Sequence, residues 1–267
     1  MSPAARRTVR YLTVALALLV TAGLFAHPED DFCEPGDDSM DPALCAALAE
    51  LNSAEGKINQ SGMPSVLDKF GNERSIASTA VLYISIGVRH ILPDGLDHIL
   101  FVLAIFLASI KLRALVIQIS AFTIAHTATL ALAASGVITP SPAIVEPLIA
   151  LTIGFVAVEN LFFKDMTKWR PAVVFGFGLV HGMGFAGFFG ELGLPPGQFW
   201  SALISFNVGV EIGQLTVIAA AAALGLALRR VLNDAGGARQ YRRFVVLPGS
   251  ALIGFVGFWW AVERIIP

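Results

Sequence analysis

Residues 199–228 read FWSALISFNVGVEIGQLTVIAAAAALGLAL, an apolar run with a single charged residue, Glu211. A helix that crosses the hydrocarbon core of a bilayer needs about 20 mostly apolar residues. This run is long enough, and it predicts a membrane-spanning helix. Asn207, Glu211 and Gln214 recur at helical spacing, so they form a polar stripe on one face of that span.

The remaining composition extends this interpretation to most of the chain. The 267 residues are 55% hydrophobic and 14% charged, whereas a soluble domain carries about 25% charged residues. We therefore expect an all-α, polytopic helical membrane bundle with about six transmembrane helices and the lipid bilayer as its main partner. Nothing in the sequence favours nucleic-acid binding. The other candidate spans are 95–110, 114–136, 143–163, 172–190 and 244–266.

A further apolar run, 76–92, precedes the first of these spans. It is short and leads into Pro93 and Gly95, which break helices. We interpret it as an interfacial or re-entrant helix on the exported side, so that 76–110 crosses the membrane once. The alternative is seven spans, with 76–92 crossing alone.

The distribution of basic residues decides between these two counts. Lys and Arg collect in cytoplasmic loops. Ten of them fall in three loops, and two other loops hold none, which fits a single crossing of 76–110 with both ends of the chain exported. The basic loops are 111–113, 164–170 and 229–243, and the loops without Lys or Arg are 137–142 and 191–198.

The first 26 residues have the composition of a secretory signal peptide. Arg6, Arg7 and Arg10 precede an apolar stretch from Tyr11 to Phe25, and cleavage is expected after Ala26. An uncleaved anchor is the alternative. We expect a multi-pass protein of the bacterial inner membrane whose N-terminus is exported.

An exported acidic segment, 27–75, follows the signal and precedes the transmembrane domain, 76–267. Eleven of the 20 acidic residues lie between His27 and Ala77. Cys33 and Cys45 both fall in this segment, and export favours a disulfide between them. Two thiolates that bind a metal are the alternative.

The first polar constellation of the membrane domain is RHILPDGLDH, residues 89–98. It contains His90, Asp94, Asp97 and His98, and a bend at Pro93 could bring these groups around one ion. Imidazole suits nickel, zinc, copper and iron. We expect a metal-capture site at the exported mouth of the bundle. The alternative is a capped helix start with satisfied polar groups.

Two further histidines lie within apolar runs. His126 is near the middle of 114–136, beside Thr123, and His181 lies between Gly178 and Gly182. Polar side chains at membrane depth usually face protein or a water-filled path. Glycines four residues apart let helices approach closely.

Glu211 completes this set, because a deeply placed carboxylate needs a partner. We expect His126, His181 and Glu211 to face one polar cavity that is continuous with His98, with Thr123, Asn207 and Gln214 in supporting positions. Hydrogen bonds that merely lock neighbouring helices together are the alternative.

Five motifs in this order resemble the HupE/UreJ family of membrane proteins, which accompany nickel enzymes such as hydrogenase and urease. The resemblance covers Gly87 to about Gln214. The nickel permeases of this family have an HPxxGxDH motif, whereas here His90 precedes Ile91 and lies one residue farther from Asp97-His98. This departure indicates a second branch of the family. The motifs are GLDHILF (95–101), AFTIAHTATL (121–130), VEPLIALTIGFVAVEN (145–160), FGLVHGMGFAG (177–187) and LISFNVGVEIGQ (203–214).

Together these observations predict a secondary permease for a divalent transition metal and not an enzyme. Nickel is the first candidate, with cobalt, copper or zinc as alternatives, and no permanent cofactor is expected. The chain has no GxxxxGK[ST] motif, so we expect no ATP hydrolysis. An intramembrane zinc-dependent hydrolase and a metal-binding accessory or sensor protein are the alternative functions.

Overall fold

The computed structural model describes residues 75–109, 111–163, 168–185, 197–232 and 237–266, and the regular structure within them is entirely helical. The expected all-α class is therefore confirmed for this part of the chain. The expected signal peptide, the acidic segment and both cysteines lie outside the described residues.

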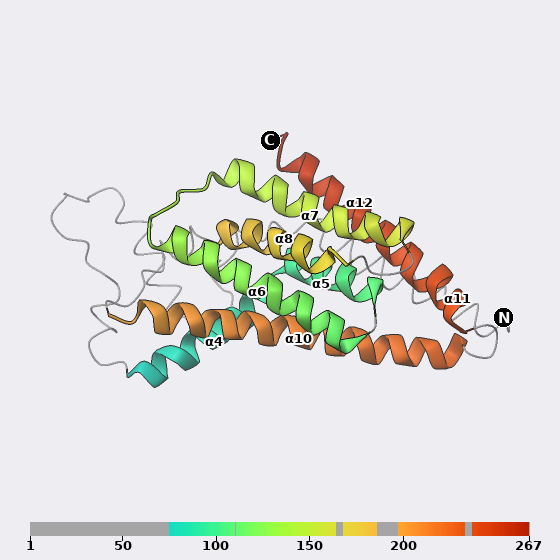
Figure 1. Cartoon of the computed structure of the whole chain (residues 1–267), viewed down its shortest axis with the longest axis horizontal. Helices are drawn as coiled ribbons and strands as arrows, with labels where there is room; N and C mark the ends of the chain where they lie inside the picture. Colours follow the sequence, from blue (N-terminus) through green and yellow to red (C-terminus); the bar gives the residue numbers. More distant parts are fainter. Residues whose placement is uncertain (1–74, 110, 164–167, 186–196, 233–236, 267) are drawn as a thin grey trace, which may run out of the picture.

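The helices form an elongated bundle in which α5 occupies a central position (Figure 1). Most of their bounds lie within a few residues of the expected spans, although α8 ends six residues earlier than expected. The elements are α4 (Ile76–Ile91), α5 (Leu96–Ala108), α6 (Leu112–Ala134), α7 (Pro142–Phe162), α8 (Arg170–Gly184), α10 (Phe199–Leu232), α11 (Gly237–Tyr241), the π-helical turn η3 (Arg242–Val246) and α12 (Leu247–Glu263).

Three pairs of helices pack most closely: α4 with α10, α6 with α8, and α7 with α12. Glycines lie at these crossings. A Cβ added to Gly87 would collide with the carbonyl oxygen of Phe206 on α10, and a Cβ at Gly182 would collide with the carbonyl oxygen of His126 on α6. The close approach expected from Gly178 and Gly182 is thus present, and it brings α8 against the histidine of α6.

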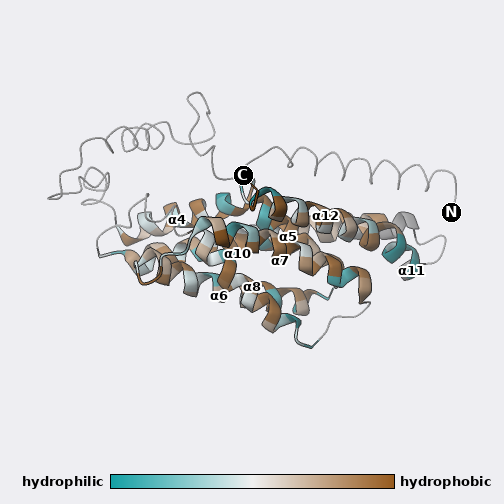
Figure 2. Ribbon diagram, turned by 90° about the horizontal axis from the view of Figure 1, so that it is seen from above, coloured by the Kyte–Doolittle hydropathy of each residue, from teal (hydrophilic) through white to brown (hydrophobic). Residues whose placement is uncertain are grey.

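The outer surface of the bundle is apolar. Hydrophobic residues cover most of the helices, and the short α11 is a hydrophilic exception (Figure 2). Large side chains such as Ile124, Phe155 and Phe255 are exposed on this surface. A soluble monomer rarely exposes apolar surface so widely, so the surface fits a multi-pass membrane protein.

Four segments, Leu112–Ala134, Pro142–Phe162, Phe199–Leu228 and Arg239–Glu263, are each long and apolar enough to cross a membrane. The pair α4 and α5, bent by 70° at a short break, qualifies as a fifth if it is counted as one span. The α8 helix has 15 residues, which is short for a span on its own. The expected count of six is therefore not confirmed. Because α4 packs along α10, it belongs to the bundle.

The helix ends that border the three basic loops of the sequence lie toward one end of the bundle. The C-terminal ends of α5, α7 and α10 and the starts of α6, α8 and α11 all point toward that end (Figure 1). We call it the basic end, marked by Lys111, Arg113, Arg170 and Arg242. The loop between α6 and α7 and the end of α12 lie toward the opposite end, as the distribution of Lys and Arg predicted.

Candidate metal site

The site begins at the break between α4 and α5. His90 lies in the last turn of α4 and His98 in the first turn of α5. Their ring centroids are 4.8 Å apart. Gly95 makes this approach possible, because a Cβ there would collide with the carbonyl oxygen of His90. The break therefore folds two histidines of one motif onto each other.

A third histidine reaches the same point from α6. His126 is fully buried, and its ring centroid lies 5.9 Å from that of His98 and 6.2 Å from that of His90. One ring nitrogen from each of these three histidines lies within 4.8 Å of the other two. Metal–imidazole bonds of about 2.1 Å place two ligand nitrogens at most about 4.2 Å apart, so the rings would have to move closer together to bind a metal. The site lies beside the middle of α6, so it is deeper than the exported mouth expected from the sequence.

The fourth histidine of the membrane domain lies beside these three. The ring centroid of His181, near the end of α8, is 5.1 Å from that of His98, and its side chain is buried. We refer to His90, His98, His126 and His181 together as the histidine cluster. The structure thus brings together four histidines from four helices, α4, α5, α6 and α8.

The polar atoms of the cluster are incompletely satisfied. Among the described residues, no hydrogen-bond partner is present for Nε2 of His90, His98 or His126, or for Nδ1 of His181. Buried polar atoms normally have partners, and exceptions call for an explanation such as an ion. Three of these histidines, His90, His98 and His126, offer ligand atoms that lie within 4.8 Å of one another, and such a donor set suits a borderline transition metal.

Two of these rings are held by hydrogen bonds from outside the cluster. Nδ1 of His126 is 3.0 Å from Oδ1 of Asn207 on α10. Nε2 of His181 is 2.8 Å from Oγ1 of Thr152 on α7. Asn207 was expected in a supporting position, whereas the role of Thr152 carried no signal in the sequence beyond its place on an apolar helix.

A cavity of about 70 Å³ opens beside the cluster. That volume has room for an ion and a few water molecules. The cavity lies on the side of the cluster away from the basic end. Two of its lining residues show this, because Gly184 ends α8 and Ile149 lies in the half of α7 away from the basic end. The cavity is lined by His90, Asp94, Gly95, Leu96, Asp97, His98, Ile149, His181, Gly184 and Phe185.

The two aspartates expected as ligands line this cavity, but Asp97 has another partner. Its carboxylate forms a salt bridge with Arg264, with a distance of 3.0 Å from Nη1 to Oδ2. Both side chains are largely buried. In this structure the charge of Asp97 is therefore neutralised by an arginine from the end of α12.

Glu211 lies apart from the cluster. Its Oε1 accepts a hydrogen bond of 2.8 Å from the hydroxyl of Ser120, and Glu211 does not line the cavity described above. Ser120 precedes His126 by six residues, about 9 Å along α6 toward the basic end. The structure therefore does not bring Glu211 into the expected cavity. Its hydrogen bond with Ser120 joins α10 to α6, the two helices that the contact between Asn207 and His126 also joins.

Of the other supporting residues, Thr123 lies between Ser120 and His126 on α6, and Gln214 follows Glu211 by three residues on α10. Thr123 on α6 donates a hydrogen bond of 3.1 Å to Oε1 of Gln214 on α10. Both side chains are buried. The three residues of the polar stripe predicted on α10, Asn207, Glu211 and Gln214, therefore all form hydrogen bonds with side chains of α6.

Phenylalanines close the cluster on the side of the basic end. Phe101 lies one turn beyond His98 toward that end, and Phe122 and Phe177 lie one turn from His126 and His181 in the same direction. The ring of Phe101 is 5.0 Å from that of Phe122 and 6.2 Å from that of Phe177. We call these three residues the phenylalanine layer.

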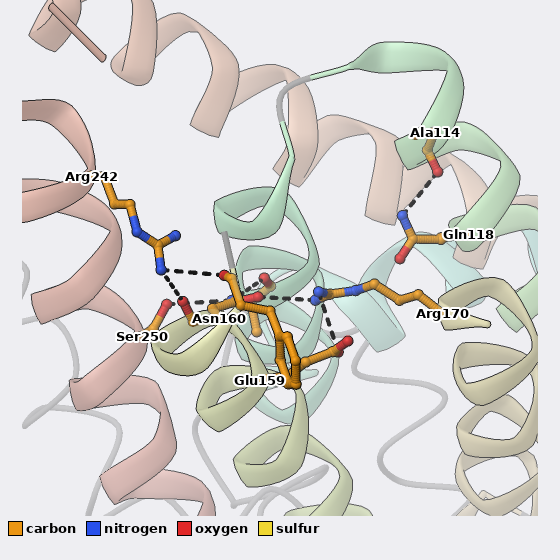
Figure 3. A network of polar contacts seen from close by, with 9 residues as sticks. Ala114, Gln118, Glu159, Asn160, Arg170, Arg242 and Ser250 are labelled. Carbon is orange, nitrogen blue, oxygen red and sulfur yellow. Dashed lines mark hydrogen bonds and ion pairs between the residues drawn. The ribbon is translucent and has the colours of Figure 1, made fainter. Parts of the chain in front are cut away.

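A second polar network lies at the basic end (Figure 3). Arg170 forms a salt bridge of 3.2 Å with Glu159, and its Nη2 donates to Oδ1 of Asn160. Asn160 in turn donates to the carbonyl oxygen of Ala104 on α5. Arg242 donates to backbone carbonyls at the end of α7. This network ties α5, α7, α8 and η3 together beyond the phenylalanine layer.

Comparison with known proteins identifies one family. The family model described as HupE / UreJ protein matches residues 67–264. This range is longer than the part of the chain, Gly87 to about Gln214, in which the sequence motifs resemble the family. Comparison with curated proteins and with solved structures gives no match in either case.

Proposed function

The chain belongs to the HupE / UreJ family, and from that premise we propose that it is a secondary permease for a divalent transition metal. The family is associated with nickel and cobalt transport. Nickel is the first candidate, and cobalt, copper and zinc are the alternatives that imidazole ligands also accept.

The observation that carries this proposal is the histidine cluster at the break between α4 and α5. Transporters commonly bind their cargo where a membrane helix is interrupted near the middle of the bilayer. Here the break coincides with three imidazoles whose ligand atoms lie within 4.8 Å of one another. We propose His90, His98 and His126 as ligands of the transported metal, with His181 beside them.

We propose that the metal arrives through the cavity away from the basic end. Asp94 and Asp97 line that cavity, and because the charge of Asp97 is paired with Arg264, Asp94 is the carboxylate that would attract a cation. We propose that the ion passes the phenylalanine layer toward the basic end, where Glu211 supplies the next carboxylate. Inward movement would then require the layer to part, and Glu211 would receive the ion.

The proposed topology has six crossings of the inner membrane: the broken pair α4 and α5, then α6, α7, α8, α10 and α12. The basic end faces the cytoplasm, as the positive-inside rule requires. In this arrangement the cavity faces the exported side. Import of metal is therefore the direction we propose. We also propose that the signal peptide is cleaved after Ala26.

Uptake of radioactive metal into proteoliposomes tests the proposal. The purified protein is reconstituted and offered nickel, cobalt, zinc and copper in turn, with His98→Ala as the variant that removes a ligand. We expect saturable uptake of at least one of these metals by the wild type and its loss in the variant. Loss of an orienting partner alone costs about 10–100-fold in metal affinity, so loss of a ligand should cost more.

The outcomes also separate the permease from an accessory or sensor protein. Metal binding by the wild type without uptake would overturn the permease and favour an accessory or sensor protein. Equal uptake by wild type and His98→Ala would show that the histidine cluster is not part of the transport path. The folded state of the variant is checked by gel filtration and circular dichroism in detergent.

A further inference from the structure

Two residues outside the histidine cluster hold its rings in defined orientations. Asn207 is on α10 and Thr152 is on α7, and the two side chains are 5% and 6% exposed. Each contacts one histidine through one ring nitrogen and leaves the other nitrogen of that ring without a partner among the described residues. The hydrogen atoms on these bonds can be assigned, because each partner is already committed elsewhere.

The amide of Asn207 can only accept a hydrogen bond from His126. Its Nδ2 donates to the carbonyl oxygen of Leu203 over 2.8 Å. The reversed amide would place two acceptors against each other. Oδ1 therefore faces the ring and accepts from Nδ1–H of His126. In a neutral imidazole that carries its hydrogen on Nδ1, the lone pair is on Nε2, which is the orphaned atom.

The hydroxyl of Thr152 is committed in the same way. A hydroxyl has one hydrogen, and that of Thr152 donates to the carbonyl oxygen of Ile149 over 2.6 Å. Oγ1 therefore accepts the hydrogen bond from Nε2–H of His181. The lone pair of His181 is consequently on Nδ1, again the orphaned atom of that ring.

We infer that Asn207 and Thr152 are positioning residues that fix His126 and His181 in opposite tautomers, so that Nε2 of the first and Nδ1 of the second both present lone pairs to the metal. The inference rests on the proposed function and deepens it. His90, His98 and His126 have ligand atoms within 4.8 Å of one another, and the inference adds His181, whose ring centroid is 5.1 Å from that of His98, as a fourth neutral ligand.

The chemistry of this site narrows the class of cargo. The charge of Asp97 is paired with Arg264, and the four ligands inferred here are all neutral imidazoles. Such donors suit nickel, cobalt, copper and zinc, whereas magnesium, calcium and manganese prefer carboxylate, carbonyl and water oxygens. Partners that fix the tautomer of a ligating histidine also raise its basicity as a ligand. Removal of either acceptor should therefore weaken binding without removing a ligand.

The test uses full-length protein in detergent with nickel as the probe. Thr152→Val removes the acceptor at nearly constant shape, and Thr152→Ser restores it. Asn207→Leu removes the other acceptor. Thr127→Val is the matched control, because the hydroxyl of Thr127 also donates to a carbonyl of its own helix, that of Thr123, and Thr127 lies next to His126 on α6.

Two measurements are made on each variant. Nickel affinity is measured by equilibrium titration, and the tautomer of each ring by nitrogen-15 spectroscopy of histidine-labelled protein without metal. We expect Thr152→Val and Asn207→Leu to lose about 10–100-fold in affinity and to lose the assigned tautomer of His181 and His126, respectively. Thr152→Ser and Thr127→Val should keep both the affinity and the tautomers.

The inference is overturned if the wild type binds nickel and Thr152→Val and Asn207→Leu bind it equally well, or if the wild-type rings show the opposite tautomers. That result leaves the proposed permease intact. Conversely, the assigned tautomers with binding but no uptake in proteoliposomes would contradict the permease and leave the positioning role in place.

Discussion

The carboxylate of Asp97 is held by the guanidinium of Arg264 through two hydrogen bonds, 3.0 Å from Nη1 to Oδ2 and 3.4 Å from Nη2 to Oδ1. The arginine also donates to the carbonyl oxygen of Glu146 and lies over the ring of Trp260. The pair thereby joins α5, α7 and α12 next to His98. A charge-assisted pair at this depth fixes the start of α5 and, with it, the orientation of the histidine that follows.

We expect Asp97 and Arg264 to contribute to stability as one unit. Asp97→Asn and Arg264→Gln should each lower the free energy of unfolding, and the double variant should lose less than the sum of the two. The interaction energy of residues in direct contact is about 0.5–3 kcal/mol. Unfolding by denaturing detergent in mixed micelles measures it for all four proteins. Additive losses would show that the two residues act independently.

Gly182 permits the contact between α8 and α6 that places His181 beside His126. Gly182→Ala should destabilise the protein by about 1–3 kcal/mol, as overpacking commonly does, because the new Cβ meets the carbonyl oxygen of His126. Gly176→Ala on the same helix is the control, since a Cβ there meets nothing within 4 Å. Thermal unfolding in detergent compares them, and equal melting temperatures for the two variants would refute the packing role.

Much of the fold could be predicted from local properties of the sequence. Hydropathy located the helices, because a membrane-spanning helix is formed by a continuous run of apolar residues that can be recognised in the sequence. The distribution of Lys and Arg predicted which loops share an end of the bundle. The spacing of Gly178 and Gly182 predicted a close helix contact, because small residues act through the face they share.

The depth of the site could not be predicted in the same way. The break at Pro93 and Gly95 was visible, but whether 76–92 lies at the surface or packs into the bundle depends on α10, which is distant in sequence. Because α4 packs along α10, the break lies beside the middle of α6. His90 and His98 are therefore deeper than expected.

The partners of the acidic residues could not be predicted from the sequence either, because they come from segments that are distant along the chain. Arg264 is 167 residues from Asp97, and no local pattern links them. Ser120 likewise provides a hydrogen bond to Glu211 from 91 residues away. A deep carboxylate suggested a histidine partner, but the register of α6 against α10 pairs it with a hydroxyl instead.

The topology of α8 separates six crossings from five. If α7, α8, α10 and α12 all cross the membrane, reporters placed after Gly136 and after Pro267 should lie on the same side. If α8 does not cross, they should lie on opposite sides. Alkaline phosphatase fusions at the two positions measure this, and we expect both to be active because both positions are exported.

Glu211 should matter for movement of the ion more than for its capture. Glu211→Gln keeps an oxygen that can accept from Ser120 but removes the only carboxylate of its span. We expect nickel affinity of the purified variant to stay within about threefold of the wild type, since less than 1 kcal/mol separates such values. Uptake into proteoliposomes should fall at least tenfold. A parallel fall in affinity would place Glu211 in the capture site instead.

Phe101 should control release of the metal toward the basic end. Its ring is fully buried, 5.2 Å from the ring of His181 and 5.0 Å from that of Phe122. Phe101→Ala removes the centre of the phenylalanine layer and should speed the escape of metal from preloaded proteoliposomes, with the histidines still in place. Because a large core truncation costs about 3–5 kcal/mol of stability, Phe101→Leu provides a milder variant that should show a smaller increase. Phe255→Ala is the control, since that ring is 61% exposed on the outer surface of α12. Escape rates of the two Phe101 variants equal to that of Phe255→Ala would show that the layer does not restrict the path.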